Sequence, residues 1–362
     1  MAPKRAIIRE SIGSGVFFVG GLLTAIVSIK DVARRAGVSP KTVSRAINGE
    51  VHGRAEVRHA VQRIVDEVGY RPNAFPRSLS SSQSYLIGLF IDDPGSGYAA
   101  DVQLGALKRC RERSDDLVVE PVDMKTGGWR EQVADSLAAL RLEVAIMTPP
   151  LYDHGGLLDV LDAAESPYVR ISPREGGDRS AVVRMDHRAA AFEMTGHLLA
   201  LGRFDVDFIR GDPNTSASLL HYESFRAAVA AADLAVERVF ERDLTLRAGI
   251  EPGEQVLRAR PHPTAMFASN DDTALGVLIT AMKLDVSVPE QLSIAGFDDA
   301  LIARASSPQL TTIRQPKAEM AAAAVDVLVD PTYRTSKNKA AQRLLELSLI
   351  SRMSTSRPVT SF

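Results

Sequence analysis

The sequence predicts two structural classes in one chain. Near the N-terminus is a small all-α region with a helix-turn-helix, and after it a large α/β region of doubly wound parallel sheets. Residues 28–48, SIKDVARRAGVSPKTVSRAIN, have the pattern of two short helices joined by a tight turn. From residue 84 onward, short apolar runs alternate with amphipathic segments, as in repeated strand–helix units. A Pro- and Ser-containing stretch separates the two regions and has the composition of a linker.

The two N-terminal helices are marked by their end signals. Ser28 and Asp31 form the pattern of a capping box, which predicts a helix start. Gly37 ends this helix, because glycine readily adopts the left-handed conformation of a C-cap. Ser39 followed by Pro40 then predicts an immediate second start, with an N-cap and a proline at the first helical position.

The second helix has a polar and basic outer face. Its outward side chains can all hydrogen-bond to bases or phosphates; they are Lys41, Ser44, Arg45 and Asn48. A third amphipathic helix is predicted over residues 57–68, which allows three helices to bury a small core. Residues 28–82 contain ten Lys and Arg against five Asp and Glu, whereas the whole chain has a net charge of −2. Only this basic region is suited to approach the phosphates of DNA.

The run DVARRAGVSPKTVSRAIN resembles the DNA-binding domain of the LacI (lactose-repressor) family of bacterial transcription regulators. The resemblance extends over nearly the whole chain from Ser28 onward. It implies a periplasmic-binding-protein-like core of two lobes, with the chain crossing three times between them. The expected regions are an atypical extension at 1–27, a DNA-binding domain at 28–72, a hinge at 73–83 and a core at 84–362. The N-lobe is expected at about 84–185 and 315–342, and the C-lobe at about 186–314 and 343–362.

The resemblance also implies how the second helix meets DNA. The expected base-reading residues are Pro40, Lys41 and Arg45. The residues expected to hold the DNA backbone are Ser39, Thr42, Ser44 and Asn48. Arg45 is the best candidate for a bidentate contact to a guanine edge, whereas Pro40 has no backbone donor and can read only by shape.

The hinge is expected to be a short helix that forms on DNA. In this interpretation Arg77 and Leu79 lie in the minor groove, where Leu79 is an apolar wedge that kinks the duplex. A flexible linker is the alternative. Pro76 stands where the family usually has Ala, and it biases Phe75 away from helical angles, which counts against the helix.

Ligands of doubly wound lobes bind beyond the carboxyl ends of the strands. Polar residues in such places are Asp93 and Tyr98 after the first predicted strand, and Asn270 and Asp298 after two later ones. Their carboxylates suit sugar hydroxyls, although acidic residues at strand ends also cap helices. By resemblance, Asn270 and Asp298 match effector-contacting positions, while His221 stands where most relatives have Arg. Arg170 is a candidate to replace the missing cation.

Cys110 is the only cysteine, which excludes an internal disulfide and fits a reducing cytoplasm. Residues 1–27 place three basic residues before a short apolar run, like a signal peptide, but that run is too short to span a bilayer. The favoured explanation is that translation begins at Val27. A disordered arm and a membrane anchor are the alternatives.

The expected function is a transcription regulator in the cytoplasm, associated with the nucleoid. We expect a homodimeric repressor of carbohydrate genes that binds a pseudo-palindromic DNA operator and a small sugar-like effector. A transport solute-binding protein would share the core fold but leaves the helix-turn-helix unexplained. No phosphate loop, nucleophile elbow or metal-spaced cluster suggests an enzyme, a cofactor or a metal site. No heptad repeat follows the final predicted strand at 344–354, so a dimer is expected instead of a coiled-coil tetramer.

Overall fold

The computed structural model describes residues 27–47, 55–68, 70, 86–142, 144–174, 179–213, 215–235, 238–259, 261–335 and 342–359. The chain divides into two compact units, residues 1–82 and 83–362. Several sequence predictions fall outside the described residues: the extension at 1–26, Asn48, Phe75, Pro76, Arg77, Leu79 and the hinge as a whole.

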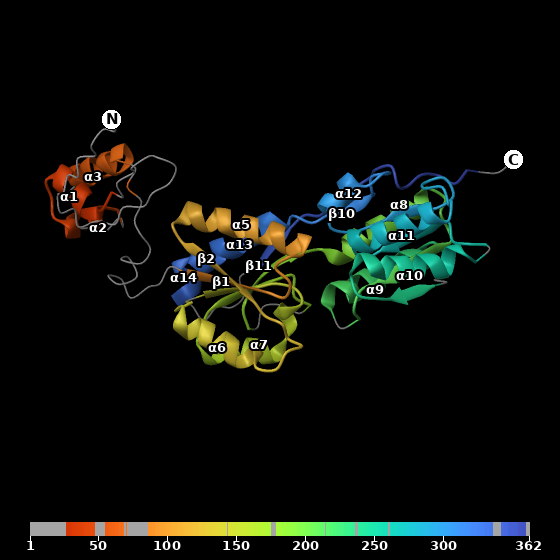
Figure 1. Cartoon of the computed structure of the whole chain (residues 1–362), viewed down its shortest axis with the longest axis horizontal. Helices are drawn as coiled ribbons and strands as arrows, with labels where there is room; N and C mark the ends of the chain where they lie inside the picture. Colours follow the sequence, from red (N-terminus) through yellow and green to blue (C-terminus); the bar gives the residue numbers. More distant parts are fainter. Residues whose placement is uncertain are drawn as a thin grey trace, which may run out of the picture. The chain divides into compact units, whose positions relative to one another are not determined.

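The described residues of the first unit form three helices, α1 (Ile29–Ala36), α2 (Pro40–Ile47) and α3 (Ala55–Val68) (Figure 1). The capping box predicted for α1 is present, since Asp31 Oδ2 accepts hydrogen bonds from Ser28 N at 2.9 Å and from Ser28 Oγ at 2.6 Å. Gly37 ends α1 with a φ of +66°, as the C-cap signal predicted. The sequence therefore located the turn between α1 and α2 correctly.

A small apolar core joins these helices. Its buried centre contains Val32 and Ala33 of α1, Val43 of α2 and Val61 of α3. Because every helix contributes to one core, the packing fixes which face of α2 is turned outward.

The first sheet of the larger unit is six-stranded and parallel, in the order β11-β5-β4-β3-β1-β2. Its strands are β1 (Leu86–Ile91), β2 (Asp116–Pro121), β3 (Val144–Met147), β4 (Tyr168–Ile171), β5 (Ala181–Met185) and β11 (Gln342–Leu345). Helices α5 (Gly97–Arg113) and α13 (Lys317–Val329) cover one face, and α6 (Trp129–Ala139) and α7 (Gly155–Ala163) cover the other (Figure 1). The short elements η1 (Leu151–Asp153) and α14 (Pro331–Thr335) complete this lobe.

The second sheet is four-stranded and parallel, in the order β7-β6-β8-β9. Its strands are β6 (Val206–Arg210), β7 (Val239–Glu241), β8 (Ala265–Ala268) and β9 (Ser293–Ala295). Helices α8 (His187–Ala200) and α9 (Ser216–Ala231) pack in one core, while α10 (Leu246–Leu257) and α11 (Asp271–Lys283) pack in the other. The short helix α12 (Leu301–Ala305) follows β9. The predicted fold class is confirmed: a helix-turn-helix region comes first in the chain, and parallel sheets covered by helices follow it.

The chain passes between the two sheets three times: after β5, after β10 (Thr312–Arg314) and after β11. Strand β10 pairs antiparallel with β12 (Ser348–Ile350), beside the second sheet. Strand β11 pairs with β5 through Leu345, so the last crossing lies after this residue and not at the expected boundary of 342. The predicted final strand over 344–354 is therefore two strands, β11 and β12, which belong to different sheets.

Candidate DNA-binding helix and effector site

Helix α2 presents the residues that the sequence predicted would face DNA. Pro40, Lys41 and Arg45 are exposed, and Val43 is buried beneath them. Lys41 and Arg45 are four residues apart and so lie on the same side of the helix. The outer face of α2 therefore carries two cations above an apolar core.

Two residues expected to contact the DNA backbone fix the start of α2. Ser39 Oγ accepts a hydrogen bond from Thr42 N at 3.1 Å and lies 2.8 Å from Thr42 Oγ1. This N-cap satisfies one of the free N–H groups at the start of the helix. Ser44 is half-buried one turn later. Backbone-contacting hydroxyls are thus held in place before DNA arrives.

In the larger unit, Tyr98 and Asp298 come together although they follow strands of different sheets. Tyr98 lies in the first turn of α5, and its hydroxyl is buried with no hydrogen-bond partner among the described residues. Burial raises the pKa of Tyr98, and the negative charge of the nearby Asp298 raises it further. Tyr98 and Asp298 therefore lie near enough for the charge of Asp298 to act on the Tyr98 hydroxyl, although they belong to different lobes.

Asp298 belongs to a buried polar cluster with Gln315 and Lys317. Its Oδ1 accepts a hydrogen bond from Gln315 Nε2. Burial raises the pKa of Asp298 to about 7, although the charge of Lys317 lowers it. Lys317 is buried at the start of α13, with Nζ 3.1 Å from Asp101 Oδ2 of α5. A carboxylate, an amide and an ion-paired ammonium thus meet between elements of the two sheets.

Arg170, at the end of β4, is also buried. Its Nε donates to Ser180 Oγ at 3.0 Å, and its Nη1 lies 3.7 Å from Asp153 Oδ1. Asp153 Oδ2 in turn accepts a hydrogen bond from Ser216 Oγ, at the start of α9. Arg170 is therefore connected through Asp153 to the second lobe, and its charge is already paired.

His221 lies in α9 and is buried against Phe297, which directly precedes Asp298. Its Nε2 is 2.9 Å from Nδ1 of His187, the first residue of α8. Burial lowers the pKa of His221 well below its ordinary value, and the neighbouring His187 lowers it further. The position that most relatives fill with a cation therefore holds a neutral ring in this chain.

Two predicted effector residues, Asn270 and Asp93, make local hydrogen bonds that hold the backbone around them. Asn270 is the N-cap of α11: its Oδ1 accepts from Thr273 N at 3.0 Å, and its Nδ2 donates to Leu244 O at 2.7 Å. Asp93 is exposed, and its Oδ1 accepts from Gly95 N at 2.9 Å in the turn before α5. Asp93 is not brought into the buried polar cluster, and the amide of Asn270 has one donor left.

Sequence reasoning missed several members of this region: Asp101, Asp153, His187, Gln315 and Lys317. All of them lie in the first turns after strands, or where the chain crosses between the sheets. The available signal was the run Gln315-Pro316-Lys317 at the start of α13. It places two polar side chains and a helix-breaking proline where the chain crosses between the two sheets. That signal is weak without knowledge of which segments cross.

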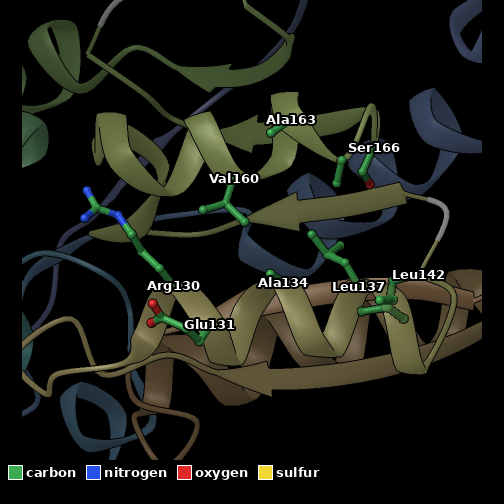
Figure 2. Close-up of a pocket in the computed structure, with 10 residues that line it drawn as sticks. Arg130, Glu131, Ala134, Leu137, Leu142, Val160, Ala163 and Ser166 are labelled. Carbon is green, nitrogen blue, oxygen red and sulfur yellow. The ribbon is translucent and has the colours of Figure 1, made fainter.

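A cavity of about 650 Å³ lies elsewhere, between α6 and α7 of the first lobe (Figure 2). Its walls are mostly apolar, including Leu137, Leu142 and Val160, with Arg130 and Glu131 at one end. None of the predicted effector residues lines it. Ligand sites usually combine apolar walls with convergent polar groups, and the polar groups of this lobe converge at the strand ends instead.

Within the described ranges, no group of three or more His, Cys, Asp or Glu side chains has the arrangement of a metal site. No helix in the same part of the chain has the length and apolar character needed to cross a membrane.

Comparison with known proteins assigns both regions. Residues 28–73 match the bacterial regulatory proteins of the lacI family, and residues 195–355 match the periplasmic binding protein-like domain. The chain is 29% identical over 295 residues to the HTH-type transcriptional regulator AscG of Escherichia coli strain K12, covering 80% of this chain and 87% of the relative.

Solved structures give the same result. The Lac repressor dimer bound to operator and the anti-inducer ONPF superposes with a TM-score of 0.74 at 25% identity, covering 91% of this chain and 99% of that one. The complex of the transcriptional regulator CelR with cellobiose superposes with a TM-score of 0.69, also at 25% identity, with coverage of 91% and 99%.

Proposed function

The chain belongs to the LacI family of bacterial regulatory proteins, and we propose that it represses carbohydrate genes by binding a pseudo-palindromic operator as a homodimer. The observation that carries this proposal is the outer face of α2, where Lys41 and Arg45 stand exposed above a core built from all three helices. A recognition helix of this kind enters the major groove, and two-fold symmetric dimers meet two half-sites.

We further propose the residue roles on DNA. Pro40, Lys41 and Arg45 face the bases, with Arg45 bidentate to a guanine. Ser39, Thr42, Ser44 and Asn48 hold phosphates, and Arg77 and Leu79 of the hinge enter the minor groove. The N-cap formed by Ser39 on Thr42 N supports the first group of backbone contacts, because it positions both side chains at the start of α2.

The effector is proposed to bind between the two lobes of residues 84–362, at the carboxyl ends of their strands. Its proposed contacts are Tyr98, Arg170, His221 and Asp298. Arg170 and His221 are buried, Tyr98 and Asp298 are half-buried, and together they connect elements of both sheets. Asn270 contributes at most its remaining amide donor, and Asp93 lies at the edge. A sugar-like ligand is supported by the complex of CelR with cellobiose and by the carboxylate-rich setting.

We also propose that the protein acts in the cytoplasm, in association with the nucleoid, and that it is not an enzyme; the similarity to transcription regulators supports this proposal. The test is to select DNA from a random pool with the full chain, and then to footprint the selected sequence. We expect a palindromic consensus whose affinity falls steeply with salt, because several phosphates are neutralised at once. Recovery of no consensus, or an affinity that does not respond to salt, would contradict the proposal.

A further inference from the structure

Two buried histidines touch at the carboxyl ends of strands in the larger unit. His187 begins α8 directly after β5, where the chain first crosses between the sheets, and His221 lies in α9 after β6. Their inner nitrogens, His187 Nδ1 and His221 Nε2, are 2.9 Å apart. Phe297 packs on both rings, with centroid distances of 4.1 Å to His221 and 6.0 Å to His187.

The outer nitrogens of the same two rings are not satisfied. His187 Nε2 and His221 Nδ1 are buried and have no hydrogen-bond partner among the described residues. A buried polar atom without a partner loses its hydration and gains nothing in return, so such atoms are rare in folded proteins. Two of them in one contacting pair, at strand ends, indicate a partner that binds there.

The inner hydrogen bond fixes what these two nitrogens offer. A neutral imidazole carries one N–H, and one of the inner nitrogens must donate to the other. If His187 Nδ1 donates, then His187 Nε2 is an acceptor and His221 Nδ1 is a donor. If His221 Nε2 donates, both outer roles are reversed. In either case the pair offers one donor and one acceptor.

We propose that His187 and His221 form a specificity-determining pair that contacts the effector through its hydroxyl groups and selects against phosphate or carboxylate groups. This inference rests on the proposed function, since it concerns the same site. A hydroxyl both donates and accepts, so it can match either outer nitrogen in either arrangement. An anionic group only accepts, so it leaves the accepting nitrogen unpaired.

The electrostatic setting supports this selection. For both outer nitrogens to donate to an anion, the neutral pair must gain one additional proton. Burial opposes this, because it lowers the pKa of His187 to about 4 and also lowers the pKa of His221. Two buried cations of the region have a carboxylate nearby: Lys317 Nζ lies 3.1 Å from Asp101 Oδ2, and Arg170 Nη1 lies 3.7 Å from Asp153 Oδ1. An anionic ligand would therefore meet a neutral histidine pair and compensated cations.

The first experiment screens matched compounds on the purified full chain. The neutral compounds are D-ribose, D-glucose and cellobiose. The anionic compounds are D-ribose 5-phosphate, D-glucose 6-phosphate and D-glucuronate. Each is tested at about 10 mM, a concentration far above the typical dissociation constants of specific ligands. The readouts are the rise in Tm and the change in affinity for the selected DNA. A response to at least one neutral member, exceeding that of its anionic counterpart, is expected.

The second experiment separates ligand contact from a structural role. His187→Asn and His221→Gln each keep an amide where the inner nitrogen was, so both retain the contact between the two side chains, and both remove the outer nitrogen. We expect each to lower the affinity for the responding sugar roughly tenfold, the value of one hydrogen bond, and a cooperative unfolding transition without ligand shows that the variant folds. A purely structural pair would leave sugar affinity unchanged in these variants.

The outcomes are distinct. A stronger response to a phosphate or carboxylate, no response to any neutral member, or unchanged sugar affinity in both variants would each overturn the inference, and the screen alone decides if a variant does not fold. DNA binding by the wild-type chain reports the proposed function separately. If the protein selects a palindromic sequence while the neutral sugars fail, the regulator remains and only the hydroxyl-reading pair is rejected.

Discussion

At the scale of single residues, arginine side chains occupy different environments in the two units. Arg45 is exposed on α2, at a position proposed to face DNA, while Arg203 is fully buried beside the second sheet. Guanidinium groups suit both tasks because their donors form a rigid planar fork. The environment of each arginine, and not its chemistry, decides whether it reads a ligand or holds the fold together.

Arg45→Ala should abolish selective DNA binding and leave the fold intact. Loss of a bidentate guanine contact costs about 1 to 3 kcal/mol of discrimination between bases. The matched control is Arg63→Ala, which removes the same charge from an exposed position of α3. Footprinting and competition with scrambled DNA measure the effect. If both variants lose the same affinity on all sequences, Arg45 contributes only charge and does not read bases.

Arg203→Met should destabilise the larger unit severely. The guanidinium donates to five backbone carbonyls, at distances from 2.5 to 3.2 Å, which belong to Thr264, Pro289, Glu290, Gln291 and Ser356. Its removal leaves buried acceptors unpaired, so the free energy of unfolding should fall by about 3 to 5 kcal/mol. Arg203→Lys keeps the charge with fewer donors and should fall in between. Urea denaturation of the three proteins checks this order.

At the scale of elements, most strands and the helix-turn-helix were predictable, whereas the edge strands β2 and β7 were not. Strands β3 and β8 are continuous apolar runs buried on both faces, which makes them visible in the sequence. Strand β2 contains charged residues at both ends and β7 has only three residues, so neither has a clear pattern. Helix α10 contains Pro252 in its interior, a residue that normally argues against a helix.

The candidate site divides in the same way. Tyr98 and Asp298 were found because the carboxyl ends of parallel strands collect ligand-binding side chains. Lys317, Gln315 and His187 escaped detection because they lie at crossings, and the crossings depend on which strands pair across the sheet. His221 was identified through the resemblance, but its contact with His187 joins residues 34 positions apart and has no sequence signal.

Gly249→Ala should weaken the packing of α10 on α11. A Cβ at this position would lie 1.9 Å from Thr273 O, a backbone atom that cannot move alone. We expect a loss of about 1 to 3 kcal/mol in the free energy of unfolding from overpacking. Gly196→Ala in α8 is the matched control, because its Cβ meets nothing within 4 Å. That change should stabilise by up to about 1 kcal/mol through helix propensity. Equal effects in denaturation experiments would show that steric contact is not the cause.

At the scale of the whole molecule, the DNA-binding unit is basic while the remainder of the chain is acidic, although the net charge is only −2. This separation directs DNA toward the helix-turn-helix and away from the lobes. Within the larger unit the buried ionisable groups oppose one another in their response to pH. Asp298 has a raised pKa of about 7, whereas His187 has a lowered pKa of about 4. As the pH changes, these two groups therefore alter the free energy of unfolding of the larger unit in opposite directions.

Folded Asp298 holds its proton above the pH at which the unfolded residue, with an ordinary pKa of 3.8, has lost it. Its contribution to stability is therefore complete below the unfolded pKa and is lost as pH rises to about 7. Folded His187 releases its proton below the ordinary 6.5, so its contribution is complete above that pH and is lost as pH falls toward about 4. Between these limits, raising the pH strengthens one contribution and weakens the other.

Asp298→Asn should therefore make stability rise more steeply with pH than in the wild type. The variant lacks the stabilising contribution that wild-type Asp298 loses as the pH rises from about 3.8 to about 7. The Tm of the variant relative to the wild type should therefore be higher at pH 8 than at pH 5. His187→Asn should show the reverse, because it removes the term that strengthens up to pH 6.5. Calorimetric Tm values for the three proteins at several pH values measure both slopes. Parallel Tm profiles for Asp298→Asn and the wild type would mean that Asp298 stays ionised in the folded protein, with Lys317 outweighing its burial.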